Sequence, residues 1–365
     1  MNMRALMLSA ALCAACSFSA LAAETDFLQC ASRLNDSERL KCYDDLASAR
    51  QRESQPSPAI SDAAQSTNTL PTLAEEPAAE SERPVRKERS WLTRAWNLDG
   101  GARGGGAQLT PLRPYRTSYL IVRASDRRNN RPTSSSTGFP TVAPLDLDAL
   151  ETKFQFSFKA EIMNYRHIDW MGFKDFRLWG AYTQQSNWQA FNARNSAPFR
   201  ETNYEPELIA TFGTGNRVGG PKVVNLGLVH QSNGKGATDS RSWNRIYLQS
   251  GWEWERNISL MARVWWRIPE RLVSDDNPDI SDYVGRADAV IRWDPSRSQS
   301  VSLLLRNNLS MGANRGFVQL DWTTPIFIGK SAKLHAQITS GYGESLIDYN
   351  HRQTTFGLGV SFREW

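Results

Sequence analysis

From Trp91 onward, the sequence repeatedly alternates apolar with polar side chains over segments of about ten residues. A period of two is that of an extended strand, in which successive side chains point to opposite faces of the sheet. Apolar residues two positions apart recur in several segments: Phe154, Phe156 and Phe158; Leu226 and Leu228; and Phe356, Leu358, Val360 and Phe362. The pattern predicts strands that each have one apolar face and one polar face.

We count about twelve such segments in the last roughly 275 residues, an even number that allows about 23 residues for each strand and its connection. They begin near residues 115, 153, 174, 205, 222, 243, 257, 281, 299, 316, 332 and 354. A closed antiparallel barrel satisfies every backbone hydrogen bond in lipid and leaves no sheet edge. The predicted fold class is therefore all-β: a twelve-stranded antiparallel transmembrane β-barrel with a small helical, partly disordered N-terminal extension.

The aromatic residues favour a membrane barrel over a soluble sandwich. All 13 Trp lie from Trp91 onward, and several segments carry Trp or Tyr near their ends, as in YLQSGWEW (Tyr247 to Trp254). Aromatic girdles occupy such positions at the two membrane interfaces, whereas a sandwich needs no such placement. The chain also ends in an aromatic residue, Trp365, as outer-membrane barrels often do, although Trp365 is out of phase with the last apolar series.

The first residues have the features of a secretory signal peptide, which we assign to residues 1–23. An early arginine precedes an apolar stretch that ends at Phe18, and the sequence ALAA follows shortly after it. Cys13 and Cys16 would be removed with this peptide. A lipoprotein acylated at Cys16 is a lesser alternative, because Cys13 stands where such a signal needs an apolar residue. Beyond the first two dozen positions, no run of about 18 apolar residues occurs, so no spanning helix is expected.

Three further segments are predicted. Residues 24–48 contain Cys30 and Cys42, which in an exported protein suggest a small helical hairpin held by one disulfide, with a reactive pair as the alternative. Residues 49–90 contain no aromatic residue and are rich in Pro, Ala, Ser and Glu, so they are expected to form a disordered linker. Residues 91–365 are expected to form the barrel.

The net charge argues against a nucleic-acid partner. Lys and Arg number 43 against 38 Asp and Glu, which gives a net charge of +5 spread along the chain. Nucleic-acid binding requires basic residues concentrated on one surface. We therefore expect no nucleic-acid partner.

The most informative stretch is VHQSNGKGATDSRSWNRIY, which runs from Val229 to Tyr247. His230 and Ser232 are two residues apart, so they project from the same face of a strand. That face also carries Leu226 and Leu228. The pair is therefore predicted to point outward, toward lipid.

Asn244 lies on the apolar face of the next segment, which begins after a connection from Asn233 through Trp243. It shares parity with Ile246, Leu248, Trp252 and Trp254. In an antiparallel hairpin, the start of the second strand lies beside the end of the first, so Asn244 can lie next to His230. Three polar groups are thus expected to converge on an apolar wall.

This constellation has a chemical interpretation. A serine hydroxyl becomes nucleophilic when an imidazole takes its proton and a third group fixes the tautomer of that imidazole. An amide in the third place avoids a charge that faces hydrocarbon. The alternative is that the three residues only cap strand ends at the membrane interface. No G-x-S-x-G or H-E-x-x-H motif occurs, and His167, His335 and His351 lack comparable neighbours, so we expect them to be structural or exposed.

The sequence H-Q-S-N-G followed by S-R-S-W-N resembles the active-site hairpin of the outer-membrane phospholipase A family. Three further blocks are similar to family sequences: SAPFRETNYEPEL (Ser196 to Leu208), DDNPDI (Asp275 to Ile280) and SGYGESLIDYN (Ser340 to Asn350). The resemblance covers roughly residues 110–365, and together the blocks are highly specific.

The resemblance implies a twelve-stranded barrel that hydrolyses acyl esters of membrane phospholipids in the outer membrane. It implies that Ser232 is the nucleophile and that His230 is the general base and acid. It also implies that Asn244 orients the imidazole and that Gly234 supplies a backbone N–H to the oxyanion.

The resemblance further implies a calcium ion (Ca2+) beside the oxyanion site of a homodimer. The matching positions are Ser196, contributed across the interface, with Lys235, Ser240 and Asp276. Carboxylate, hydroxyl and carbonyl oxygens suit this hard cation, and its charge would stabilise an oxyanion. Lys235 departs from the family, which commonly has arginine there; the exchange is tolerable if the residue ligates through its carbonyl.

Gln184 resembles a polar residue of the family's dimer interface, and a glutamine of the lumen or girdle is the alternative. Because substrate surrounds such an enzyme, completion of the site only in a dimer would limit its activity. The Cys30 to Cys42 segment and the linker lie outside the resemblance. A periplasmic position is expected for them if the strand number is even and the N-terminus stays inside.

Two other functions remain as alternatives. A non-catalytic pore or structural barrel would conduct ions and show no esterase activity, but the inward positions carry bulky Phe, Tyr, Arg and Glu side chains. An enzyme that deacylates lipid A would share the chemistry, but we expect a smaller barrel for it. A survey of the released products distinguishes the three.

Overall fold

The structure is a computed structural model that describes residues 30, 35–53, 90–98, 106–107, 111–136, 138, 144–170, 172–215, 219–296, 298–326 and 332–362. The signal peptide assigned to residues 1–23, most of the predicted linker and Trp365 lie outside the described residues. The chain divides into two units, Met1–Arg83 and Pro84–Trp365.

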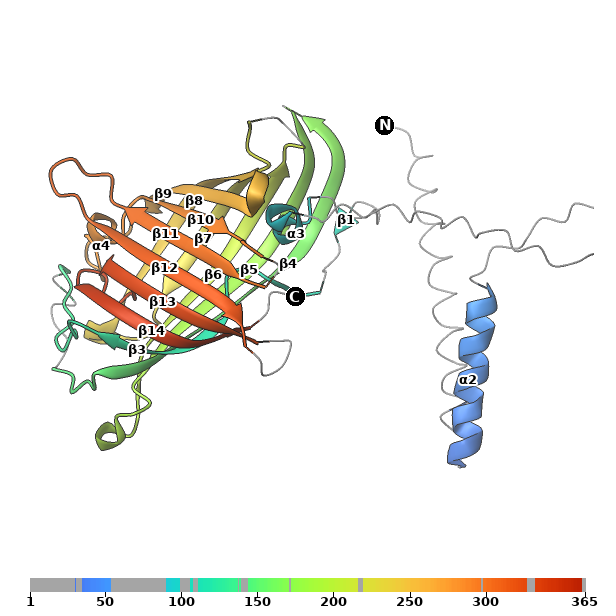
Figure 1. Cartoon of the computed structure of the whole chain (residues 1–365), viewed down its shortest axis with the longest axis horizontal. Helices are drawn as coiled ribbons and strands as arrows, with labels where there is room; N and C mark the ends of the chain where they lie inside the picture. Colours follow the sequence, from blue (N-terminus) through green and yellow to red (C-terminus); the bar gives the residue numbers. More distant parts are fainter. Residues whose placement is uncertain are drawn as a thin grey trace, which may run out of the picture. The chain divides into compact units, whose positions relative to one another are not determined.

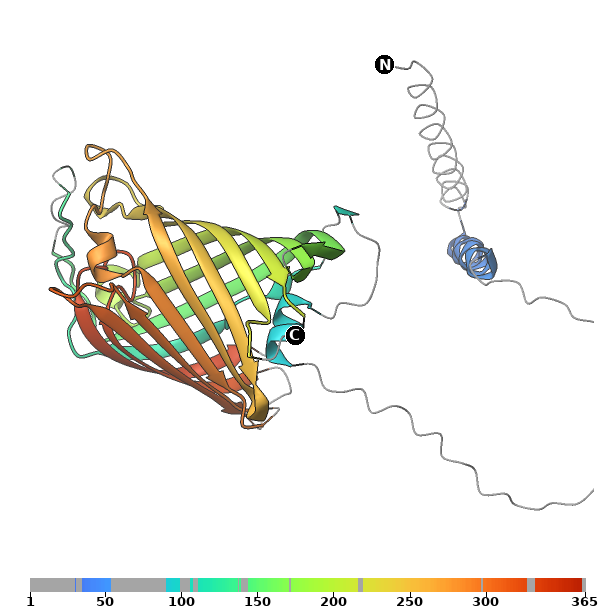
Figure 2. The same ribbon diagram turned by 90° about the horizontal axis from the view of Figure 1, so that it is seen from above.

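The second unit is a closed antiparallel β-barrel of twelve long strands (Figure 1; Figure 2). The strands are β3 (Tyr119–Ser125), β4 (Leu150–Trp170), β5 (Phe173–Trp188), β6 (Phe199–Gly213), β7 (Val223–Ser232), β8 (Ser242–Trp254), β9 (Ile258–Ile268), β10 (Ala287–Trp293), β11 (Ser300–Asn307), β12 (Gly316–Pro325), β13 (Ala332–Tyr342) and β14 (Arg352–Phe362). Each strand pairs with the next along the chain, and β14 pairs with β3 to close the cylinder. The predicted twelve-stranded barrel is confirmed.

The other described elements are short, except for one helix in the first unit. They are α2 (Asp36–Glu53), α3 (Trp91–Trp96), β1 (Gly106–Ala107), β2 (Arg113–Pro114), η1 (Ala193–Asn195), η2 (Ala237–Asp239), η3 (Glu255–Asn257) and α4 (Ile280–Tyr283). Strands β1 and β2 both pair with β4. Because the twelve long strands alternate in direction, the connections after β3, β5, β7, β9, β11 and β13, which include the long ones, lie at one end of the barrel, and the other connections lie at the opposite end.

The strand predicted from about residue 281 begins later in the structure. Helix α4 occupies this position, and β10 begins only at Ala287. Ile280 and Val284 are both buried, and their spacing of four residues places them on one side of a helical turn. Gly285, with a φ of +102°, ends the turn and lets the chain enter the strand.

The two faces of the strands separate as the alternation predicts. Leu226 and Leu228 are about half exposed on the outer wall of the barrel (50% and 49%). In the same hairpin, Asn225 and Arg245 are buried inside. An apolar exterior and a polar interior are the arrangement expected of a barrel that faces lipid.

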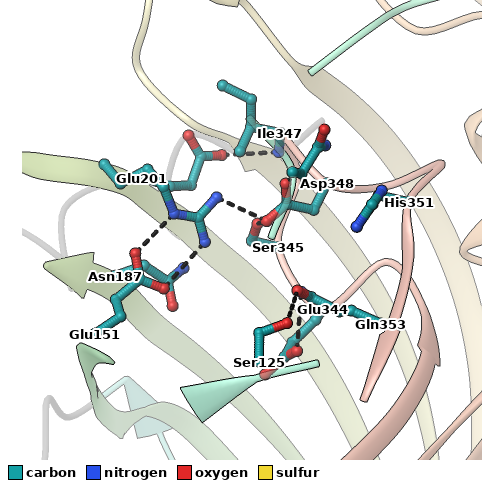
Figure 3. Close-up of polar contacts among 12 residues, drawn as sticks. Ser125, Glu151, Asn187, Glu201, Glu344, Ser345, Ile347, Asp348, His351 and Gln353 are labelled. Atoms are coloured by element: carbon teal, nitrogen blue, oxygen red, sulfur yellow. Dashed lines mark hydrogen bonds and ion pairs between the residues drawn. The ribbon is translucent and has the colours of Figure 1, made fainter. Parts of the chain in front are cut away.

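Charged side chains from distant strands form a network inside the barrel, at the end with the long connections (Figure 3). Arg200 donates from Nε to Glu151 Oε1 and from Nη1 to Asp348 Oδ2, each at 2.7 Å. The backbone N–H of Ile347 donates to Glu201 Oε1 at 3.0 Å. The network therefore ties β6 to the connection between β13 and β14, and it holds Glu201 in place.

Helix α3 lies at the opposite end of the barrel, and the period-two pattern does not predict it (Figure 1). Trp96 is buried and packs edge-on against Tyr115 and Trp179, with ring centroids 6.1 and 6.4 Å apart. Lys159 Nζ lies 3.3 Å from the centroid of the Trp96 ring, a cation–π contact. The lumen keeps a cavity of about 310 Å³ lined largely by polar and charged side chains. Side chains therefore fill much of the interior, unlike the aqueous channel of a porin.

In the first unit, Cys30 and Cys42 form the predicted disulfide. Helix α2 carries Cys42 and continues to Glu53, past residue 48, where the linker is expected to begin. Within the part of the chain that the structure describes, no helix has the length and apolar character needed to cross a membrane.

Candidate active site

Strands β7 and β8 form a hairpin that brings His230 directly opposite Asn244. His230 Nδ1 lies 2.9 Å from Asn244 Oδ1, a hydrogen-bond distance. His230 is exposed on the outer wall together with Leu226 and Leu228. The predicted convergence of these two side chains on the apolar wall is therefore present.

Ser232 lies on the same face as His230 and ends strand β7. It is half-buried and pairs with Tyr204 on one side and with Ser242 on the other. Among the hydrogen bonds of the described residues, none joins Ser232 to His230. Residues two apart on a strand are separated by about 6.6 Å along it, so the two side chains must rotate toward each other to meet.

The loop between β7 and β8 (residues 233–241) is organised by Asn233, which the sequence patterns do not single out. Asn233 is buried, and its Oδ1 accepts the backbone N–H groups of Lys235 (3.2 Å) and Arg241 (3.0 Å). Its Nδ2 donates to the backbone oxygen of Asp239 at 2.7 Å and to Glu201 Oε2 at 3.4 Å. One amide side chain therefore spans the loop from start to end and anchors it to the interior network.

Gly234 follows Asn233 and has a φ of +64°, in the left-handed region that favours glycine. A Cβ at this position would lie 2.9 Å from Tyr204 Cε2. The backbone conformation and the neighbouring ring therefore both favour glycine at the position where the family resemblance implies an oxyanion donor.

The resemblance implies that Gly234 donates its N–H group to the oxyanion, so we expect Gly234→Ala to lower ester hydrolysis by about tenfold to a hundredfold, because the strained backbone would misdirect that group. The measurement is the initial rate of ester hydrolysis in detergent micelles. Gly236→Ala is the matched control, since a Cβ there meets no atom within 4 Å. Equal rates for Gly234→Ala and wild type would contradict the requirement for glycine.

The loop between β9 and β10 (residues 269–286) lies against the start of β8 through Asp276. The Asp276 carboxylate is buried and accepts Ser240 Oγ at 2.7 Å through Oδ2. Its Oδ1 accepts the backbone N–H of Ser242 at 3.0 Å. The structure therefore brings together two of the predicted calcium ligands, a carboxylate and a hydroxyl.

The other two predicted ligands are placed differently. The side chain of Lys235 turns away to the backbone oxygen of Arg200, at 2.7 Å from Nζ, which leaves its own carbonyl as the candidate ligand. Ser196 is exposed, with a φ of 60°, in the loop between β5 and β6. No contact of the described residues joins the Ser196 side chain to the other three positions.

The donor set is made of hard oxygen atoms, which suit calcium. The described residues contain no group of three or more His, Cys, Asp or Glu side chains that could hold a metal ion. Calcium typically takes six to eight oxygens, so the Asp276 carboxylate and the Ser240 hydroxyl together supply only part of such a site.

Gln184 lies on the outer wall, on the opposite face to Gln185, which lines the lumen cavity. It accepts the Tyr182 hydroxyl at 3.0 Å and donates to Ser186 Oγ at 3.4 Å. A position in the lumen, one of the alternatives for Gln184, does not apply.

Glu270 is a further polar residue beside the hairpin that the sequence patterns do not identify. Asn244 Nδ2 donates to Glu270 Oε1 at 3.4 Å. Partial burial of Glu270, with smaller contributions from Asp275 and Asp276, raises the pKa of its carboxyl group above the ordinary value. The row of polar side chains thus extends from Ser232 through His230 and Asn244 to a carboxylate.

The family model described as Phospholipase A1 matches residues 92–362. A putative phospholipase A1 of Neisseria meningitidis serogroup B is 33% identical over 100% of this chain and 96% of its own length. Phospholipase A1 of Escherichia coli K12 is 36% identical over 69% of this chain and 82% of its own length.

Solved structures show the same similarity. The calcium-bound dimer of Salmonella typhi outer membrane phospholipase has a TM-score of 0.58 and 33% identity, and the match covers 72% of this chain and 95% of that one. An active-site mutant of Escherichia coli outer membrane phospholipase A, with asparagine replaced by alanine, has a TM-score of 0.60 and 32% identity, over 74% and 97% of the two chains.

Proposed function

Because this chain belongs to the phospholipase A1 family, we propose that it is a calcium-dependent outer-membrane phospholipase that hydrolyses acyl esters through Ser232, His230 and Asn244. The observation that carries the proposal is the 2.9 Å contact between His230 Nδ1 and Asn244 Oδ1 on the outer wall. Ser232 lies on the same face, two residues along the strand. Lipid esters can reach this face without leaving the membrane.

In the proposed reaction, His230 donates a hydrogen bond from its Nδ1–H group to Asn244 Oδ1, so the neutral imidazole has its lone pair on Nε2. Nε2 takes the proton of Ser232 as Oγ attacks the ester carbonyl, and it then gives this proton to the departing alcohol. Water releases the fatty acid from Ser232 in a second cycle of the same kind. The active-site asparagine of the Escherichia coli relative supports the role of Asn244.

The oxyanion formed in each step needs a donor near Ser232. The backbone N–H of Gly234 is held by its left-handed conformation and is the proposed donor. When bound by Asp276, Ser240 and the Lys235 carbonyl, calcium would supply a positive charge that stabilises the same oxyanion. Ser196 is proposed to complete this oxygen set from the partner chain.

A dimer is proposed as the active form, because one chain supplies few calcium ligands and because the Salmonella typhi relative is a calcium-bound dimer. Mixing two inactive variants tests this. Ser196→Ala and Ser232→Ala chains should each lack activity in dimers of their own kind. A mixed dimer would contain one complete site, so an equal mixture should recover about a quarter of the wild-type activity.

The readout is the rate of fatty-acid release after the two variants are mixed in detergent and allowed to exchange. Exchange is checked separately by giving one of the two variants an affinity tag and measuring how much of the untagged variant is purified with it. A mixture no more active than its parts would exclude a contribution of Ser196 across the interface.

Product analysis tests the function itself. We expect incubation of wild-type protein with diacyl phospholipid in mixed micelles to yield free fatty acid and lysophospholipid. Release of acyl chains from lipid A alone, or ion conductance without hydrolysis, would support the alternative functions instead. The N-terminal extension is proposed to be periplasmic, because an even number of strands returns both ends of the barrel to the same side.

A further inference from the structure

We propose that Glu270 is a positioning residue that fixes the orientation of the Asn244 amide and thereby selects the reactive tautomer of His230. This inference rests on the proposed function and extends its site by one residue. It is carried by the contact between Asn244 Nδ2 and Glu270 Oε1 together with the contact between Asn244 Oδ1 and His230 Nδ1.

An asparagine side chain can present either of two ends to a neighbour. Its oxygen accepts hydrogen bonds and its NH2 group donates them, and a rotation of 180° exchanges the two with little change in shape. If the NH2 group of Asn244 faced His230 Nδ1, that nitrogen would have to carry the lone pair. The proton would then lie on Nε2, and the imidazole could not take a proton from Ser232.

His230 does not by itself select between these two orientations of the Asn244 amide, because neutral imidazole can donate or accept at Nδ1. An ionised carboxylate, in contrast, only accepts. Glu270 therefore requires the NH2 group of Asn244 on its own side, which turns the amide oxygen toward His230. The carboxylate of Glu270 thus determines the tautomer without contacting the imidazole.

The catalytic site lies on an apolar wall, and the position of Glu270 explains how a charged side chain can take part in it. Glu270 follows the end of β9, two residues beyond Ile268, and Ile268 pairs with Asn244. The side chain is therefore at the loop end of the barrel rather than along the strand. The neutral amide of Asn244 lies between this charge and His230.

The distance of 3.4 Å is long for such a hydrogen bond, so we expect a moderate effect. Catalytic hydrogen bonds are often long without substrate and shorten when substrate binds. We expect Glu270→Gln and Glu270→Leu each to lower kcat by about threefold to tenfold, the range that one hydrogen bond of typical net strength would give. KM should change little, because the amide orientation affects the proton transfer and not the binding of lipid.

A double variant distinguishes positioning from simple disruption. In an Asn244→Ala background, the replacement of Glu270 should have no further effect, since no amide remains to be oriented. The calcium concentration for half-maximal activity should also stay at the wild-type value in Glu270→Gln. Disruption of the loop would instead displace Asp276, which lies in the same loop, and raise the calcium requirement.

Glu255→Gln is the matched control, because Glu255 is an exposed glutamate at the turn between the other ends of β8 and β9. If wild-type protein hydrolyses phospholipid but both Glu270 variants stay within twofold of it, the inference is overturned and the proposed function stands. A raised calcium requirement, or an equal loss in the Asn244→Ala background, also overturns it. Absence of hydrolysis by wild-type protein would overturn both.

Discussion

Ser232→Ala is expected to reduce phospholipid hydrolysis at least about a thousandfold, to the rate of the micelles alone or close to it. Ser232 is the hydroxyl nearest in sequence to His230 on the outer wall, and alanine removes the attacking oxygen while keeping the strand. The variant should still fold, because the Ser232 side chain is half-buried at the end of β7 and its backbone pairing is unchanged.

Two measurements separate the loss of chemistry from the loss of fold. The heat-dependent shift of the barrel in gel electrophoresis should be the same for Ser232→Ala and wild type. Ser340→Ala is the matched control, since Ser340 also lies near the loop end of the outer wall, on β13, where it pairs with Thr354 through a hydroxyl contact of 3.0 Å. Hydrolysis by Ser232→Ala at more than a tenth of the wild-type rate would refute the assignment of the nucleophile.

Removal of calcium is expected to have the second-largest effect, a loss of about a hundredfold or more, which is typical when a main stabiliser of an oxyanion is removed. A chelator with high affinity for calcium should abolish fatty-acid release, and added calcium should restore it. Magnesium should restore little, because it demands a compact octahedral site and gives up its waters reluctantly.

The Asp276→Asn variant connects this effect to the proposed ligands. It keeps an oxygen that can accept Ser240 Oγ, but it removes the charge, so half-maximal activity should require at least about tenfold more calcium. Asp282→Asn provides the control, because Asp282 lies in the same loop with its side chain exposed and paired with Arg286. Full activity in excess chelator would contradict the calcium site altogether.

The barrel and the face of the active-site hairpin could be predicted because they depend on a simple periodicity. A period of two fixes which side chains share a face, so His230 and Asn244 could be placed on the apolar wall from parity alone. Because one loop (residues 233–241) joins β7 to β8, the two strands pair as neighbours, and the observed register brings the two residues opposite each other.

The rest of the site depends on connections, where no period applies. Glu270 lies beyond the end of β9, two residues after Ile268, and a polar residue past the end of a strand gives no signal in a sequence pattern. Asn233 is similarly hidden, since its role consists of hydrogen bonds to backbone groups of its own loop. Helix α3 is too short to establish a helical periodicity, and its tryptophans resemble those of a strand end.

The position of His230 and Ser232 at the loop end of β7 has a consequence for the proposed catalytic cycle. In the proposed reaction, each catalytic cycle consumes one molecule of water, whereas the ester substrates are soluble in lipid. His230 and Ser232 are the third-last and last residues of β7, next to the loop of residues 233–241. If the same two residues were moved two positions toward the middle of the strand, the serine should still be acylated. Hydrolysis of the acyl group should then be slow, because water has less access to that part of the wall.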